Sequence, residues 1–105
     1  MRKMSTSLRK HSVKIKLVGV LQGITGRHEV SVKFKEPILV SQLLQDLCER
    51  LGPAFKQTVI DPELNDPRSN TLILVNDVEI SALQGLKTKI ARNDTVVIIP
   101  VSHGG

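Results

Sequence analysis

The sequence predicts an α+β fold in which a mixed sheet of four to five strands wraps around one main helix. Three observations support this fold class. Two runs of alternating apolar residues, 13–20 and 28–34, have the period of half-buried strands. A run with the helical period lies between them and the second half of the chain, at about 41–51. Two further β-branched runs, 71–75 and 95–101, have the composition of strands.

The first two runs are expected to pair as a hairpin. Apolar residues occupy positions 13, 15 and 17 of the first run and positions 30, 32 and 34 of the second. Each run therefore has one apolar side and one polar side, as a strand on a core does. The segment 22–26 between them contains two glycines, and we interpret it as a turn or short loop.

The helix has the clearest pattern in the chain. Its apolar stripe consists of Val40, Leu43, Leu44, Leu47, Cys48 and Leu51. We expect Ser41 to be the N-cap, Gly52 to follow the last turn and Pro53 to prevent continuation. Because Cys48 lies on the apolar stripe, it is interpreted as a small buried hydrophobe rather than a nucleophile.

The remaining elements complete the order of the fold. Residues 53–70 are rich in Pro, Asp and Asn and are expected to form a long connection. A turn at Asn76-Asp77 joins the strand 71–75 to a short strand at 78–80. Residues 83–90 are expected to be a loop or a helical turn before the last strand, 95–101. The order β-β-α-β-β-β with one central helix resembles the β-grasp fold.

The net charge of +5 is concentrated at the amino terminus. Residues 1–12 contain four basic residues and no acid. We therefore expect a flexible basic leader at 1–12, a β-grasp domain at 13–101 and a flexible tail at 102–105. The near-neutral body and the two aromatic residues offer little for nucleic-acid binding, so direct binding of nucleic acid is not expected.

Composition also excludes other kinds of site. A single cysteine and three dispersed histidines predict neither a disulfide nor a metal site. No apolar run approaches the length that crosses a bilayer, and no signal peptide is visible, so a cytoplasmic protein without membrane contact is expected. The acidic residues show no spacing that indicates acid–base catalysis, and we expect no enzyme activity.

The sequence ends in Ser102-His103-Gly104-Gly105, directly after the last strand. Glycine has no Cβ, so a diglycine lets the backbone pass through a narrow channel. A free carboxylate delivered to ATP in this way can be adenylated and then attacked by a sulfur or amine nucleophile. This chain has no glycine-rich phosphate-binding motif, so the ATP would belong to a partner.

The second half of the chain resembles the ubiquitin-like sulfur-carrier proteins. This group includes the small subunit of molybdopterin synthase, the thiamine sulfur carrier, the ubiquitin-related modifier and the small archaeal modifiers. The resemblance rests on Leu72–Ile80, Gly85-Leu86 and Asn93–Gly105. Two features depart from the pattern: Asp77 stands where many molybdopterin subunits have glycine, and the basic leader is extra.

The resemblance implies that an E1-like enzyme adenylates the carboxylate of Gly105 with Mg-ATP and that a thiocarboxylate follows. Gly104, His103 and Ser102 would form the rest of the extended tail. The thiocarboxylate would supply sulfur for tRNA thiolation, molybdopterin or thiamine, and the activated carboxyl could also acylate lysines of target proteins. The implied partners are the E1-like enzyme and a sulfurtransferase or synthase large subunit, and this chain binds no cofactor itself.

The last strands carry apolar residues on both faces of the predicted sheet. One helix covers only one face, so the second apolar set is expected to be exposed and to dock the activating enzyme. We place this docking surface at Ile73, Val75, Val96, Ile98 and Pro100. The alternative is that segment 53–70 folds across that face and buries it.

Two other functions stay open. As the small subunit of molybdopterin synthase, the chain would associate stably with a larger catalytic subunit. As a β-grasp binding module with a basic nucleic-acid-binding arm, it would bind RNA in a salt-sensitive way, and its diglycine would have no role.

Overall fold

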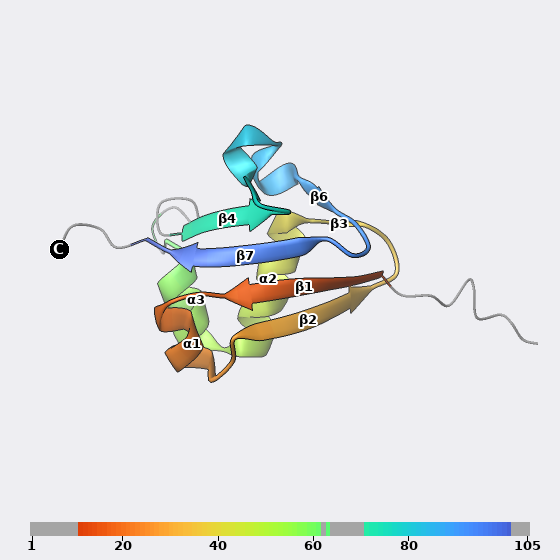
Figure 1. The fold of residues 1–105 in the computed structure, drawn as a ribbon. Helices are drawn as coiled ribbons and strands as arrows, with labels where there is room; N and C mark the ends of the chain where they lie inside the picture. Colours follow the sequence, from red (N-terminus) through yellow and green to blue (C-terminus); the bar gives the residue numbers. More distant parts are fainter. Residues whose placement is uncertain (1–10, 62, 64–70, 102–105) are drawn as a thin grey trace, which may run out of the picture.

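The structure is a computed structural model, and it describes residues 11–61, 63 and 71–101. In chain order the elements are β1 (His11–Leu17), α1 (Val20–Thr25), β2 (Glu29–Phe34), β3 (Ile38–Leu39), α2 (Val40–Leu51), α3 (Pro53–Val59), β4 (Thr71–Val75), β5 (Val78–Glu79), the 3-10 turns η1 (Ile80–Ala82) and η2 (Gly85–Lys87), β6 (Lys89–Ile90) and β7 (Thr95–Pro100). Five of the strands form a mixed sheet with α2 and α3 on one face (Figure 1). The predicted α+β, β-grasp architecture is confirmed.

The sheet has the strand order β2-β1-β7-β4-β5. Its centre is β7, which pairs in parallel with β1 and antiparallel with β4. The two hairpins, β1–β2 and β4–β5, form its two sides. A separate pair of two-residue strands, β3 and β6, joins the start of α2 to the segment before β7. The first and last strands therefore lie side by side although they are far apart in the sequence.

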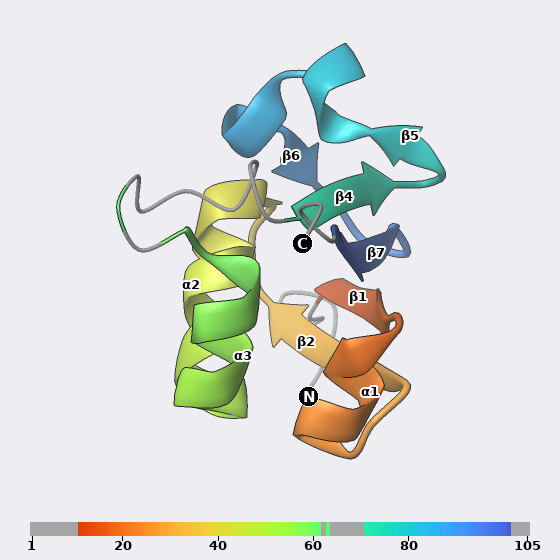
Figure 2. The ribbon, with the colours of Figure 1, turned by 90° about the vertical axis from the view of Figure 1, so that its left-hand side faces the viewer.

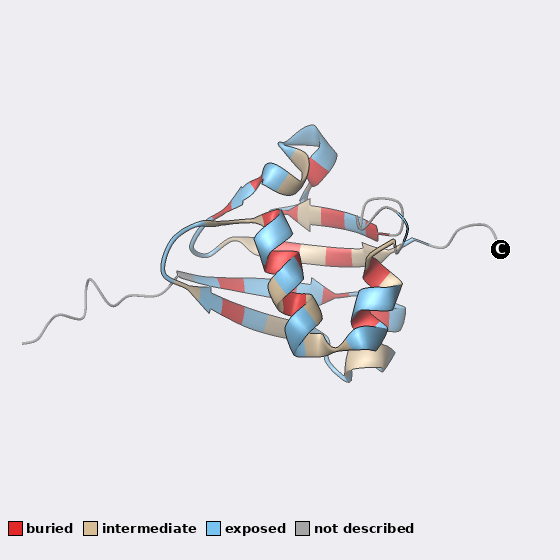
Figure 3. Cartoon of the chain, turned by 180° about the vertical axis from the view of Figure 1, so that it is seen from behind, coloured by how far each residue is buried: buried red, intermediate tan, exposed pale blue. Residues whose placement is uncertain are grey.

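The core lies between the sheet and the two longer helices (Figures 2 and 3). It is almost entirely aliphatic, as the composition predicts. The exception is Phe55 of α3, which is fully buried. From β1 the side chains at 13, 15 and 17 point into this core, while Lys14 and Lys16 between them are exposed. The predicted alternation of the first strand is therefore confirmed.

The prediction of a turn at 22–26 is wrong, because α1 occupies this connection. Leu21 is fully buried, and Ile24, one helical turn later, packs against the core. The Thr25 hydroxyl donates to the Leu21 carbonyl oxygen at 2.7 Å, and Gly26 ends the helix in the left-handed region, with φ 71°. Of the two glycines in this segment, Gly26 therefore ends a short helix and Gly23 lies inside it, and neither forms a hairpin turn.

The prediction of an unstructured connection over 53–70 is wrong in its first part, where α3 lies. Pro53 occupies the first turn of this helix, where its missing N–H costs nothing. Phe55 and Val59 lie one turn apart and are both fully buried. Most of the remainder of this connection, residue 62 and residues 64–70, lies outside the described part of the chain.

The central helix is confirmed, with a different start. Its N-cap is Leu39 and not Ser41, which is exposed in the first turn. The side chain of Gln42 takes over part of the capping, because its Oε1 accepts from the Leu39 N–H at 2.8 Å. The helix ends at Gly52, as expected, with φ 93°.

Candidate functional site

The candidate site is the end of β7, because this strand is the last element before the terminal diglycine. On one side of it, Leu17 of β1 is the register partner of Ile98. On the other side, Thr71 of β4 is the register partner of Pro100. β7 is therefore held by β1 up to Ile98 and by β4 up to its last residue, Pro100. The carboxyl-terminal segment therefore begins at a fixed position in the middle of the sheet.

Two hydrogen bonds strengthen this anchor. The N–H of Val18 donates to the Ile98 carbonyl oxygen at 3.3 Å and continues the parallel pairing past the end of β1. The buried Thr71 hydroxyl donates to the Val59 carbonyl oxygen at 3.0 Å, which ties the start of β4 to the end of α3. α3, β4 and the central strand β7 are thus joined where β7 ends.

The predicted tail residues, Ser102, His103, Gly104 and Gly105, lie outside the described residues. Their roles stay predictions. The other two histidines do not approach a common site: His28 is exposed in the segment before β2, and His11 begins β1. Within the ranges 11–61, 63 and 71–101, no three His, Cys, Asp or Glu side chains gather as a metal site would require.

The predicted docking surface is wrong in its position. The side chains of Ile73, Val75, Val96 and Ile98 are at most 5% exposed and form part of the core, and Pro100 is half-buried. The reason is that α2 and α3 cover the face of the sheet toward which these residues point (Figure 3). Ile73, Val75, Val96 and Ile98 are therefore not accessible to a partner in the folded protein.

The opposite face of the same strands carries the exposed apolar residues. It consists of Leu72, Leu74, Val97, Ile99 and Val101, which we call the outer apolar face. Leu72 is 43% and Val101 is 38% exposed, and the other three are half-buried. Because Leu72 is the register partner of Ile99, the two side chains are neighbours across β4 and β7. The idea of one covered and one open apolar face is therefore right, but the assignment of the two sets was reversed.

A signal for the correct assignment exists in the sequence. In β1 the polar side is marked by Lys14 and Lys16, and Lys16 is the register partner of Val97. The lysines and the outer apolar face thus share one side of the sheet. The sequence alone does not supply the pairing register of β1 with β7, and a shift of one residue exchanges the two faces.

Further exposed apolar residues lie beside the end of β7. Val18 and Val20, which follow β1, are 36% and 58% exposed. Since β1 runs parallel to β7, these residues reach the end of the sheet from which the tail leaves, where α1 also lies (Figure 1). Four of the six exposed large hydrophobic residues of the described chain, Val18, Val20, Leu72 and Val101, therefore lie around the start of the tail.

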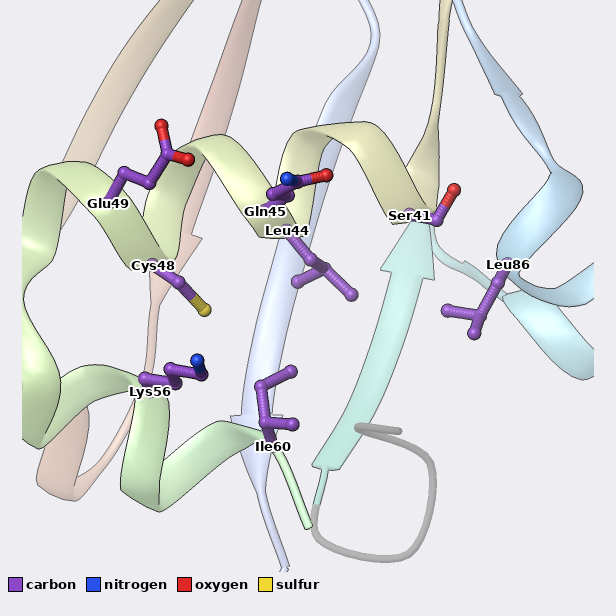
Figure 4. A pocket seen from close by; sticks show the side chains of 8 residues that line it. All are labelled: Ser41, Leu44, Gln45, Cys48, Glu49, Lys56, Ile60 and Leu86. Atoms are coloured by element: carbon purple, nitrogen blue, oxygen red, sulfur yellow. The ribbon is translucent and has the colours of Figure 1, made fainter. Parts of the chain in front are cut away.

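A pocket of about 530 Å³ lies on the other side of the molecule, between α2, α3 and η2 (Figure 4). Leu44, Ile60 and Leu86 contribute its apolar walls. Cys48 and Lys56 point toward one another from α2 and α3. The position of Cys48 on the apolar stripe is confirmed, because its side chain packs half-buried against the core.

The surroundings of Cys48 keep its thiol protonated. Burial raises the pKa of the Cys48 thiol, the Lys56 ammonium partly offsets this rise, and the Glu49 carboxylate adds to it. The thiolate is the nucleophilic form, so a raised pKa makes this cysteine a poor nucleophile near neutral pH. The pocket therefore offers no sign of covalent catalysis.

Residues 15–105 match the model of the ThiS family. Comparison with functionally curated proteins gives no match. Of the helices in the described part of the chain, none has the length and apolar character needed to cross a membrane.

Three solved structures illustrate the similarity. The small archaeal modifier protein 1 (SAMP1) from Methanosarcina acetivorans is 28% identical, with a TM-score of 0.73 over 92% of this chain and 99% of that chain. The putative molybdopterin converting factor subunit 1 from Pyrococcus furiosus is 21% identical, with a TM-score of 0.68 over 88% and 99%. A chain of the Amycolatopsis orientalis BexX/CysO complex is 23% identical, with a TM-score of 0.66 over 89% and 99%.

Proposed function

Because the chain belongs to the ThiS family, we propose that it is a sulfur carrier or protein modifier that acts through the carboxylate of Gly105. An E1-like enzyme adenylates this carboxylate with Mg-ATP and releases pyrophosphate. Hydrosulfide then attacks the acyl carbon and displaces AMP, and the chain is left with a terminal thiocarboxylate. The chain is the substrate of these steps, and ATP binds to the enzyme.

One observation carries the proposal: a diglycine follows a strand that is fixed on both sides. A reactive group that is delivered into a separate active site requires a fixed base, followed by an end that is narrow enough to enter that site. β7 provides the base through its pairing with β1 and β4. Gly104-Gly105 provides an end without side chains.

We further propose that the outer apolar face docks the activating enzyme. Leu72 and Ile99 lie on β4 and β7 and Val101 directly follows β7, and all three retain accessible apolar surface. Apolar surface that a small protein keeps exposed beside its reactive end favours a partner interface. A partner that covers this face holds the start of the tail at a fixed distance from its own ATP site.

Sulfur donation and conjugation to lysines begin with the same acyl adenylate and diverge afterwards. In the first, the thiocarboxylate gives its sulfur to tRNA thiolation or to molybdopterin synthesis. In the second, a lysine amine attacks the activated carboxyl and forms an isopeptide bond. A subunit of a molybdopterin-type synthase is the alternative that the fold of the Pyrococcus furiosus protein supports. Stable association with a larger catalytic subunit would distinguish it.

Adenylation is tested by ATP–pyrophosphate exchange with the E1-like enzyme of the same cell. The full chain is expected to support exchange, and a chain that lacks Gly104 and Gly105 is expected to support none. Ile99→Asp places a charge on the outer apolar face, and it is expected to reduce kcat/KM roughly tenfold or more, mainly through KM.

The matched control is Gln57→Asp, which adds the same charge to an exposed position of α3, on the opposite side of the sheet. It is expected to leave the exchange rate unchanged. Circular dichroism must show that all variants are folded. Exchange that survives removal of the diglycine contradicts the role of Gly105, and equal rates for the two Asp variants contradict docking through the outer apolar face.

A further inference from the structure

In the described part of the chain, β2 forms an edge of the sheet that no second strand covers. This strand is the first in the order β2-β1-β7-β4-β5 and has six residues. Within residues 11–61, 63 and 71–101, the only strand that pairs with it is β1. An open edge of this length is a template for pairing with another chain, unless the sequence prevents it.

The register shows which backbone groups point outward from this edge. The N–H of Leu17 donates to the His28 carbonyl oxygen at 2.8 Å, so this pair is hydrogen-bonded. Hydrogen-bonded pairs alternate along an antiparallel ladder, which makes 30 and 32 the next residues of β2 that bond to β1. The N–H and C=O groups of Glu29, Ser31 and Lys33 therefore point away from β1.

These three residues form a self-complementary pattern. Glu29 and Lys33 lie two residues on either side of Ser31. If a second β2 pairs antiparallel about a two-fold axis at Ser31, each Glu29 lies opposite Lys33 of the second copy. The same axis places Ser31 opposite its own copy and brings all three outward pairs into hydrogen-bonding positions. Opposite charges directly across strands stabilise pairing, whereas like charges oppose it.

We propose that two copies of this chain associate through β2 and form one continuous sheet, with Glu29 facing Lys33 at each end of the contact. The inner face of the sheet favours the same pairing. Val30 and Phe34 are half-buried at the margin of the core, and the second copy places its own Val32 beside Val30. The apolar surface of Val30 and Phe34, which is partly exposed in one copy, is expected to be more fully buried in the dimer.

The proposed dimer does not depend on the proposed function. β7 lies two strands inside the edge, with β1 between them. Val101 and the rest of the outer apolar face therefore stay open in each copy. Failure of one proposal leaves the other intact, because carboxylate activation and self-association are measured separately.

The contact consists of one strand from each copy, which is at the small end of protein interfaces. We expect a dissociation constant between about 10 μM and 1 mM. Sedimentation equilibrium over this concentration range measures it. Glu29→Lys creates two like-charge pairs in the dimer and is expected to weaken association roughly tenfold or more. Lys33→Glu is expected to have the same effect.

The decisive sample is an equimolar mixture of the two variants. In the mixed dimer, the new lysine of the Glu29→Lys copy faces the new glutamate of the Lys33→Glu copy. At the other end of the contact, the unchanged Lys33 of the first copy faces the unchanged Glu29 of the second. Each pair is again of opposite sign, so the mixture is expected to associate about as well as the unchanged protein. The double variant Glu29→Lys/Lys33→Glu should associate with itself about as well as the unchanged protein, because its exchanged charges again face each other with opposite sign. Glu36→Lys, a charge reversal outside β2, is the control and should change little.

A disulfide tests the position of the axis. In a Cys48→Ser background, Ser31→Cys is expected to form a covalent dimer upon oxidation, because residues opposite at the axis lie within disulfide range. A chain that stays monomeric up to the highest concentration overturns the proposal. A dimer whose association neither charge reversal weakens also overturns it, because such a dimer uses another surface. The proposal is likewise overturned if the equimolar mixture of the two variants associates as weakly as each variant alone.

Discussion

Two adjacent residues in the β4–β5 turn adopt backbone conformations that most residues avoid. Asn76 has φ 50° and Asp77 has φ 70°, as the tightest hairpin turns require. Asn76 is held by its side chain: its Nδ2 donates to Asp94 Oδ1 at 3.0 Å, and its Oδ1 accepts from the Thr95 N–H at 3.0 Å. The side chain of Asn76 thus joins this turn to the turn that starts β7. Asp77 is exposed.

Replacing Asp77 with glycine is expected to stabilise the protein. Glycine adopts a positive φ without the steric cost that an L side chain pays there, and Asn-Gly is a preferred pair for such turns. We expect the free energy of unfolding to rise by about 0.5–1 kcal/mol. Urea denaturation measures the change. Asp77→Ala keeps the Cβ and is the control, which should not stabilise; a glycine variant less stable than the natural protein would contradict this account of the turn.

Residue roles were predicted best where one local pattern decides them. The helical stripe is sufficient to place Cys48 against the core, and the Asn-Asp pair is sufficient to predict the turn. The face occupied by Ile73 and Ile98 was predicted wrongly, because alternation defines two faces but does not say which one the helices cover. That choice depends on contacts between elements that are far apart in the sequence.

At the scale of elements, the missed helices α1 and α3 share one cause. Each has fewer than eight residues, so it shows at most two turns of helical period. Each is held by two apolar residues that pack against the core rather than by helix propensity. Gly23, Gly26 and Pro53 indicated loops, although Gly23 lies inside α1, Gly26 ends this helix and Pro53 begins α3. The 12-residue helix α2, with three turns of apolar stripe, was recognisable from the sequence.

The junction between α2 and α3 depends on Gly52. It has φ 93° and ψ 178°, a region that essentially only glycine occupies. A Cβ there would meet no atom within 4 Å, so backbone strain alone opposes a side chain. We expect Gly52→Ala to reduce the free energy of unfolding by about 1–3 kcal/mol, measured by urea denaturation.

Gly23 provides the matched control for this substitution. It lies inside α1, and a Cβ there also meets no atom within 4 Å, but its φ is not positive. Alanine is a better helix former than glycine, so Gly23→Ala should be neutral or slightly stabilising. Equal destabilisation by the two substitutions would show that the junction does not require the backbone conformation of Gly52.

At the scale of the whole molecule, the fold separates two apolar surfaces with one sheet. The inner surface packs under α2 and α3 and stabilises the domain. The outer apolar face lies on β4 and β7, next to the start of the tail, while β1 and β2 on the same side of the sheet carry Lys14, Lys16 and Lys33. One half of this side therefore suits an apolar partner surface. The other half, toward the open edge, carries the charges that we propose pair two copies.

The sequence was sufficient to predict the fold class and the central helix. It was not sufficient for the strand order, because the pairing of β1 with β7 joins the two ends of the chain. The division of the outer side into apolar and basic halves follows from that pairing. Features that depend on long-range register thus became visible only in the folded chain.

The most direct test of the central claim is the mass of the carboxyl-terminal peptide of the protein isolated from its native cell. If Gly105 is the reactive group, a fraction of this peptide should carry the mass gain of one sulfur in place of one oxygen, or be joined to a lysine of another protein. The modification should be absent from every other peptide and lost when the E1-like enzyme is removed. A terminal carboxylate that is unmodified in all molecules, in cells where that enzyme is active on another substrate, would contradict the claim.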